Sequence, residues 1–155
     1  MEKIKTVFVG VFTALSAWLG ILAIPVYLLV CCNVIDYGTG LAAARKRGQV
    51  INSSVGLNGI IKKVCMWLLV CLGAMVDILI TYGAEQAGIT LNFGYAVGCL
   101  VAVWLICNEI ISILENMVDI GVDLPPFLAR VVENLKTQVE KQGAAALPED
   151  ANKTE

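Results

Sequence analysis

The chain is 155 residues long, and 58% of its residues are hydrophobic while only 15% are charged. Soluble domains are about 45–50% apolar and about 25% charged, and a single core of this size could not hide so much apolar surface from water. The composition therefore predicts an integral membrane protein. A net charge of −2 gives no reason to expect nucleic-acid binding, and the absence of histidine removes the commonest general base and metal ligand.

The first hydrophobic run extends from residue 7 to residue 35 without a charge. At about 1.5 Å per residue it is longer than the roughly 30 Å of hydrocarbon in a bilayer. We expect one tilted span over about 7–35, with a kink at Pro25. Two alternatives remain open. One is a re-entrant hairpin bending near Gly20 and Pro25, and the other is a cleaved signal peptide, for which the features are Lys3, Lys5, Ala14 and Ser16.

A polar and basic connection follows, from Asp36 to Lys63. Residues 41–46 could continue the first helix, and Gly48 would end it. The connection contains five cations, which suit the negatively charged cytoplasmic face of a membrane. We therefore expect a basic cytoplasmic loop that presents Arg45, Lys46, Arg47, Lys62 and Lys63.

Two further spans are predicted over about 64–82 and 93–113. The loop between them contains no lysine or arginine, so the positive-inside rule places it outside and the basic connection inside. The carboxyl end is then cytoplasmic and the amino terminus external, although Lys3 and Lys5 favour the opposite side for the amino terminus.

The third span continues as an amphipathic extension with an acidic face, which Gly121 is expected to end. A new amphipathic helix over about 125–141 follows Pro125 and Pro126. Residues 143–155 have the composition of a flexible charged tail. The sequence thus predicts an all-α fold, with one membrane domain over 1–142, about three transmembrane helices and a cytoplasmic amphipathic C-terminal helix. The apolar stripe of that helix comprises Phe127, Leu128, Val131, Val132, Leu135 and Val139.

Polar residues inside spans are costly, and they are candidates for function by default. Asp77 interrupts the second span, where it is either functional or extends to the outer surface. A polar group near the inner end of the third span either marks the membrane surface or lines an opening between subunits. The candidate pore-lining or gating residues are Asp77, Asn108, Glu109, Ser112 and Glu115.

Small residues four apart allow helix backbones to approach closely in lipid. Such spacing indicates either packing within one subunit or association between subunits. The candidate helix-packing residues are Gly94, Gly98, Ala102, Gly10 and Ala14. All six cysteines lie inside the hydrophobic runs, where we interpret them as small packing residues.

Enzyme motifs are missing from the sequence. No serine has the Gly-x-Ser-x-Gly context, and no glycine-rich loop ends in Lys-Ser or Lys-Thr. The cysteines form no Cys-x-x-Cys pair that could hold zinc. We expect no catalytic residues, no bound metal and no cofactor.

Three stretches together resemble the phage holins, in the group that includes clostridial toxin-secretion holins. They are residues 36–40 with 42–45, residues 53–54 with Gly59 and 62–63, and residues 108–116 with Gly121 and Pro125. Their order and their relation to the spans agree with the family over roughly residues 23–135.

The resemblance implies a homo-oligomer in the cytoplasmic membrane of an infected bacterium. There it would open holes that let a phage endolysin reach the cell wall, with membrane lipid and endolysin as its partners. A close variant exports a toxin or hydrolase without immediate lysis. Two other classes remain open from the residues alone: a small ion channel or transporter subunit, and a passive membrane scaffold.

Overall fold

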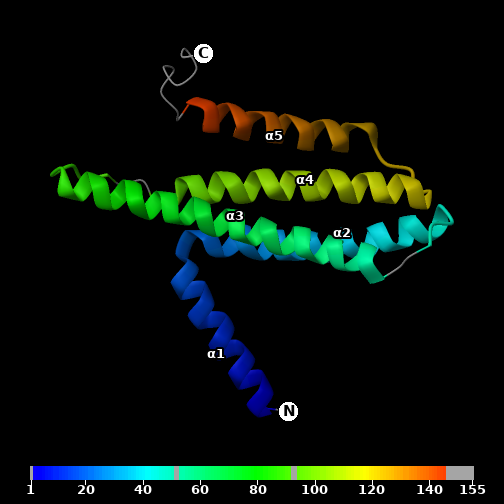
Figure 1. The fold of residues 1–155 in the computed structure, drawn as a ribbon, viewed down its shortest axis with the longest axis horizontal. Helices are drawn as coiled ribbons and strands as arrows, with labels where there is room; N and C mark the ends of the chain where they lie inside the picture. Colours follow the sequence, from blue (N-terminus) through cyan, green and yellow to red (C-terminus); the bar gives the residue numbers. More distant parts are fainter. Residues whose placement is uncertain (1, 51–52, 92–93, 146–155) are drawn as a thin grey trace.

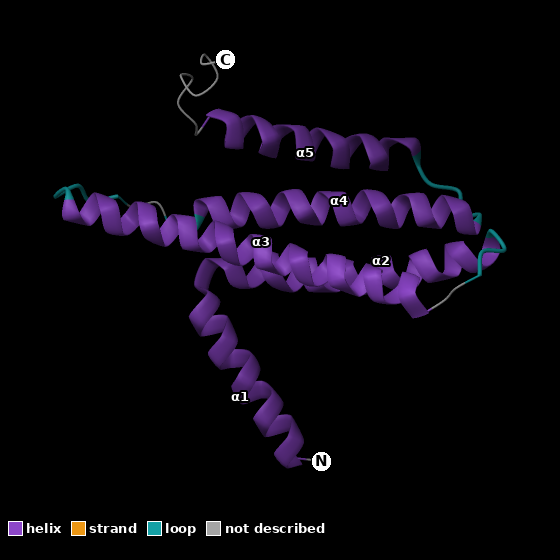
Figure 2. Cartoon of the chain, in the orientation of Figure 1, coloured by secondary structure: helices purple, strands orange, loops and turns teal. Residues whose placement is uncertain are grey.

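The computed structural model describes residues 2–50, 53–91 and 94–145, and every regular element in these ranges is a helix (Figure 2). The all-α prediction is therefore confirmed. The elements, in chain order, are α1 (Glu2–Leu19), the short 3₁₀ helix η1 (Gly20–Leu22), α2 (Ala23–Lys46), α3 (Ser53–Gln86), α4 (Ala96–Ile120) and α5 (Pro126–Ala145).

Helices α2, α3 and α4 lie side by side, α5 runs along α4, and α1 points away from this bundle (Figure 1). Three stretches are long and apolar enough to cross a membrane: Gly20–Lys46, Gly56–Gln86 and Ala96–Ile120. The predicted number of spans is confirmed.

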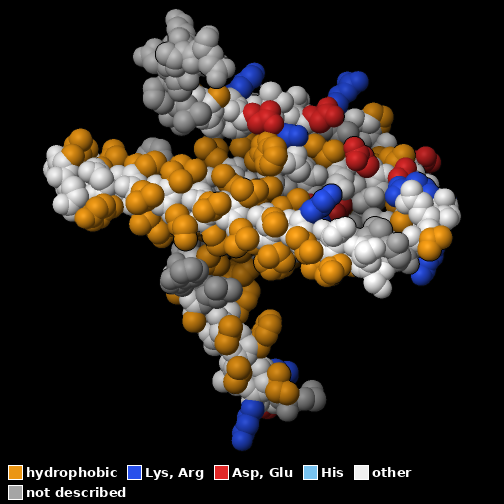
Figure 3. Space-filling view, viewed as in Figure 1, with side chains coloured by type: hydrophobic (Ala, Val, Ile, Leu, Met, Phe, Trp, Pro, Cys, Tyr) orange, Lys and Arg blue, Asp and Glu red, His pale blue; other side chains and the backbone are white. Residues whose placement is uncertain are grey.

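The hydrophobic side chains of the bundle lie mainly on its outside (Figure 3). On α3, Leu68, Leu72 and Leu79 are each more than half exposed, whereas the buried core is a small cluster centred on Leu29 and Leu105. A soluble protein reverses this distribution. These helices therefore have lipid tails as their solvent, and the chain is a membrane protein.

The prediction of one span over 7–35, kinked at Pro25, is wrong. The helix breaks at Gly20, which adopts φ +54°, and α2 then continues past Asp36 to Lys46. Pro25 lies in the first turn of α2, where a missing N–H costs no intrahelical hydrogen bond. A bend at Gly20 belonged to the hairpin alternative, but α1 diverges from α2 instead of folding back along it (Figure 1).

Helix α1 is joined to the bundle through few contacts, and Tyr27 makes the best defined of them. Its hydroxyl lies 2.7 Å from the Ser16 hydroxyl, and its ring stacks on Phe12 with 4.6 Å between centroids. Most other side chains of α1, including Phe8, are exposed.

The polar connection between the first two spans is mostly helical. Gly48, at φ +71°, follows the end of α2 as predicted, but α3 begins at Ser53, well before the expected start at residue 64. The expected loop position of Lys62 and Lys63 is therefore corrected, since both lie on α3. The third long helix begins at Ala96, and the expected start at Phe93 lies outside the described residues.

The carboxyl-terminal boundaries follow the glycine and proline signals. Gly121 ends α4, as predicted, and adopts the left-handed conformation at φ +99°. Its N–H donates a hydrogen bond to the Met117 carbonyl oxygen at 3.2 Å. Helix α5 begins at Pro126 but continues to Ala145, so the first three residues of the predicted tail are helical. Alanine favours the helix strongly enough to carry it past Gly143. Residues 146–155 lie outside the described residues.

Candidate functional site

Asp77 connects two of the membrane helices. Its side chain is 1% exposed, and its two carboxylate oxygens accept the backbone N–H groups of Val97 at 2.9 Å and Gly98 at 2.8 Å. These N–H groups belong to the first turn of α4, where a helix has no carbonyl partners of its own. Asp77 on α3 is therefore the N-terminal cap of α4.

The depth at which α4 begins explains why this cap is a carboxylate from another helix. Helix α3 extends past the start of α4 (Figure 1), and beyond Asp77 it carries exposed apolar residues such as Ile78 and Leu79. Helix α4 therefore starts inside the apolar layer, short of the edge that α3 reaches, where water cannot satisfy its free N–H groups. A carboxylate near a helix N-terminus also interacts favourably with the helix dipole.

A second polar group lies toward the opposite end of the bundle, where Lys63 bridges two carboxylates. The Lys63 ammonium donates to Asp36 Oδ2 at 2.7 Å and also to Glu109 Oε2. These three residues come from α3, α2 and α4, and their side chains are 5–15% exposed. We call Asp36, Lys63 and Glu109 the charge triad. Because two carboxylates share one ammonium, the fully ionised triad carries one net negative charge.

Amide and hydroxyl groups complete the hydrogen bonds of the triad. In the orientation that its neighbours require, the Asn33 amide donates to Glu109 Oε2 at 2.9 Å and accepts the Trp67 indole N–H at 2.8 Å. Asn116 Nδ2 donates to Asp36 Oδ1 at 3.1 Å. Among the described residues, no buried side-chain nitrogen or oxygen lacks a partner. The polar groups that α2, α3 and α4 bury are thus satisfied within one subunit.

Beyond the triad, contacts between the ends of α2 and α4 close the bundle. Arg47 pairs with Asp119, and the Lys46 ammonium donates to the Ile120 carbonyl. Arg45 and Lys62 are exposed. The predicted basic residues therefore divide into three that bind α2, α3 and α4 together and two that face outward.

The candidate pore-lining residues do not form one polar surface. Asp77 and Glu109 are both buried, at levels about 17 Å apart along α4 at 1.5 Å per residue. Asn108 and Ser112 are half-buried, and Glu115 is exposed. Ser112 lines an open cavity of about 380 Å³ beside Lys63, between α2, α3 and α4.

The candidate packing residues also separate into two groups. Gly98 lies against α3, where a Cβ atom on Gly73 would be 3.0 Å from the Gly98 Cα, and Ala102 is fully buried. Gly94 precedes α4 in a turn at φ +55°, so it is not on the expected ridge. On α1, Gly10 has nothing within 4 Å of an added Cβ, and Ala14 is exposed.

Several residues that connect the helices were not found by sequence reasoning. Asn33 lies one helical turn before Asp36, and this i, i+3 spacing inside an apolar run was an available signal. Trp67 follows Lys63 at i, i+4, which places both on one face. The pairing of Asn33 with Glu109 on α4 and with Trp67 on α3 had no local signal. In the described parts of the chain, no group of three histidine, cysteine or acidic residues could hold a metal ion.

The chain matches the model of a known protein family. The family model of the bacteriophage holins matches residues 13–137, which include the Asp77 cap, the charge triad and most of α5. The chain belongs to the bacteriophage holin family. The holins are a family of non-enzymatic membrane proteins.

Three relatives are similar to the chain over most of its length. An uncharacterised protein of Halalkalibacterium halodurans is 40% identical over 83% of this holin-family chain and 90% of its own length. An uncharacterised protein of Clostridium perfringens is 31% identical over 88% of this chain and 91% of its own length. An uncharacterised protein of Listeria innocua is 30% identical over 85% of this chain and 86% of its own length. No solved structure matches the chain.

Proposed function

We propose that this protein is a holin that accumulates in the bacterial cytoplasmic membrane, oligomerises and opens holes through which a phage endolysin leaves the cytoplasm. The observation that carries the proposal is the match of the holin family to residues 13–137. The three long apolar helices supply the membrane subunit that this function requires.

The arrangement of charges disfavours a selective ion channel. A channel of that kind needs carboxylates or carbonyls that face a water-filled path. Asp77 instead binds backbone N–H groups, and Glu109 binds Lys63 and Asn33. Both acids are engaged inside the subunit, so neither is free to coordinate a passing cation.

Inducible expression in bacteria tests the function. Cells that carry an endolysin gene express the protein, and membrane potential, culture density and release of a cytoplasmic marker enzyme are followed together. A holin gives a sudden loss of potential followed by lysis, and cells with the endolysin alone show neither. Release of the endolysin while the culture stays intact indicates an exporter. Ion flux without protein release, or no effect, contradicts the proposal.

A further inference from the structure

Helix α5 is held against α4 by Trp104. The Trp104 indole N–H donates to Glu140 Oε1 at 2.9 Å, and the Lys136 ammonium lies 5.4 Å from the centre of the indole ring. Because only the short connection after Gly121 separates them, α5 runs antiparallel to α4 along its length (Figure 1). A charged helix is thus packed along a membrane-spanning one.

The position of Trp104 fixes the depth of this contact. Trp104 is about 12 Å along α4 from Ala96, at 1.5 Å per residue, within a stretch that has no charged residue before Glu109. The contact therefore holds Lys136 and Glu140 level with the hydrocarbon layer. Each charged side chain placed there in lipid costs about 2.5–3.5 kcal/mol by insertion scales.

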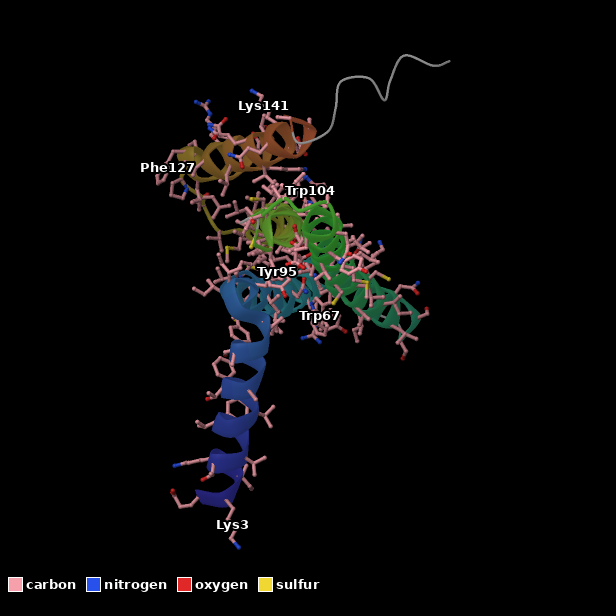
Figure 4. All side chains as sticks on the ribbon, turned by 90° about the vertical axis from the view of Figure 1, so that its left-hand side faces the viewer. Lys3, Trp67, Tyr95, Trp104, Phe127 and Lys141 are labelled. Carbon is pink, nitrogen blue, oxygen red and sulfur yellow. The ribbon has the colours of Figure 1, made fainter. Side chains whose placement is uncertain are left out.

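The surface of α5 has two different flanks. One flank is apolar, and it exposes Phe127, Val131 and Leu135 at 65%, 56% and 50%. The other flank is polar and also exposed, and it consists of Arg130, Glu133, Thr137 and Lys141. Phe127 and Lys141 accordingly point to different sides of α5 (Figure 4), and charged side chains gather over this helix in the space-filling view (Figure 3).

Each flank needs a different neighbour. Thr137 and Lys141, the part of the polar flank nearest the level of Trp104, require water at a depth where the surrounding bilayer has none, whereas the apolar flank is suited to lipid or to another apolar surface. The buried polar groups of α2, α3 and α4 are already bonded within the subunit. Helix α5 is therefore the part of the described chain that still needs water inside the membrane.

We infer that α5 lines the hole. In the assembled protein its polar flank faces the water of the hole, and its apolar flank faces away from that water. This inference rests on the proposed function. The lining mixes Arg130 and Lys141 with Glu133, so a wide hole passes proteins with little preference for their charge.

Cysteine substitution with the full-length protein in planar bilayers tests the lining. Thr137→Cys places a thiol on the polar flank, and Leu135→Cys places one at nearly the same depth on the apolar flank. A water-soluble maleimide carrying a polyethylene glycol chain is added to open holes. We expect a several-fold reduction of the smallest conductance steps for Thr137→Cys. Leu135→Cys and the unsubstituted protein, whose own six cysteines serve as the background, should be unaffected, because thiols in lipid form little of the reactive thiolate.

Charge reversal provides a second measurement that needs no added thiol. Arg130→Glu combined with Lys141→Glu should raise the preference of the smallest conductance steps for cations over anions several-fold. Lys3→Glu combined with Lys5→Glu on α1 should leave that selectivity unchanged. If the unsubstituted protein conducts but neither the polymer nor the charge reversal alters its conductance, α5 lies outside the hole and the inference fails. If the unsubstituted protein forms no hole at all, the proposed function itself fails.

Discussion

Asp77 on α3 accepts the backbone N–H of Gly98 on α4 at 2.8 Å, next to the point where Gly73 of α3 touches the Gly98 backbone. One hydrogen-bonded contact and one close backbone approach therefore hold the same two helices at the same level. The carboxylate makes the N-terminus of α4 tolerable in an apolar layer, and the glycines bring α3 near enough for the carboxylate to reach it.

Asp77→Ala is expected to destabilise the folded subunit by about 1–3 kcal/mol, because the buried N–H of Gly98 and the partly buried N–H of Val97 lose their acceptor. Asp77→Asn should fall between this variant and the native protein, since one amide oxygen can still accept. Thermal loss of helical circular dichroism in detergent measures the effect. Glu85→Ala, at an exposed position on the same helix, is the control. Equal unfolding temperatures for Asp77→Ala and the control would show that the Asp77 cap does not stabilise the fold.

Lys63→Met should lower the stability of the folded subunit much more than Lys62→Met. Removing the Lys63 ammonium leaves the buried Glu109 and the partly buried Asp36 without their cation, and breaking a fully buried pair costs about 3–5 kcal/mol. Lys62 is exposed, and its replacement should cost little. Accumulation in membranes and unfolding temperature in detergent report both variants.

The charge triad also predicts a rescue. Combining Lys63→Met with Glu109→Gln removes one of the two uncompensated charges, so it should recover part of the lost stability. No recovery in the double variant would mean that Lys63 stabilises the bundle through its packing and not through its charge.

Gly73→Ala should reduce accumulation of the folded protein, because the new Cβ would meet the Gly98 Cα at 3.0 Å, where backbone cannot give way cheaply. Gly10→Ala should be tolerated or slightly stabilising, since its Cβ would meet nothing within 4 Å and alanine favours the helix. The two variants are compared by quantitative immunoblot of membrane fractions. Equal accumulation would show that α3 and α4 can separate without cost.

Trp104→Leu is expected to loosen α5 by removing the hydrogen bond to Glu140 and the ring under Lys136. Limited trypsin digestion in detergent measures this release, because the sites after Arg130, Lys136 and Lys141 all lie on α5. We expect faster cleavage than in the native protein. Phe127→Leu, on the exposed apolar flank, should leave the rate unchanged. Unchanged cleavage in Trp104→Leu would mean that α5 is held by other contacts.

Local chemistry predicted the larger elements of the fold. Long apolar runs located three membrane helices, and Gly121 and Pro126 located the boundary between the last two helices, because helix length and termination depend on nearby residues. The sequence placed the bend of the first hydrophobic run at Pro25 instead of Gly20 for a physical reason. Proline disrupts a helix interior but is tolerated in a first turn, and only the chain path places Pro25 in a first turn.

The polar contacts could not be located in the same way. Sequence reasoning identified Asp77 and Glu109 as unusual, but their partners lie on other helices, 20 and 46 positions away along the chain. The partners of Asp77 are backbone N–H groups, which every residue except proline carries, so no residue type marks them. Likewise, the ridge of small residues gave no indication of which helix it would face.

The unequal lengths of the membrane helices have a consequence for the surrounding lipid. The apolar part of α4, from Ala96 to Asn108, spans about 20 Å, whereas the hydrocarbon of a bilayer is roughly 30 Å thick. Lipid beside α4 must therefore thin part of the way toward this length, at a cost that grows with every ångström of mismatch, while the Asp77 cap stabilises the α4 N-terminus that remains inside the apolar layer. Two copies that shared one thinned annulus would deform less lipid than two that stood apart, so this mismatch would favour contact between copies in the proposed oligomer before any specific side-chain contact forms.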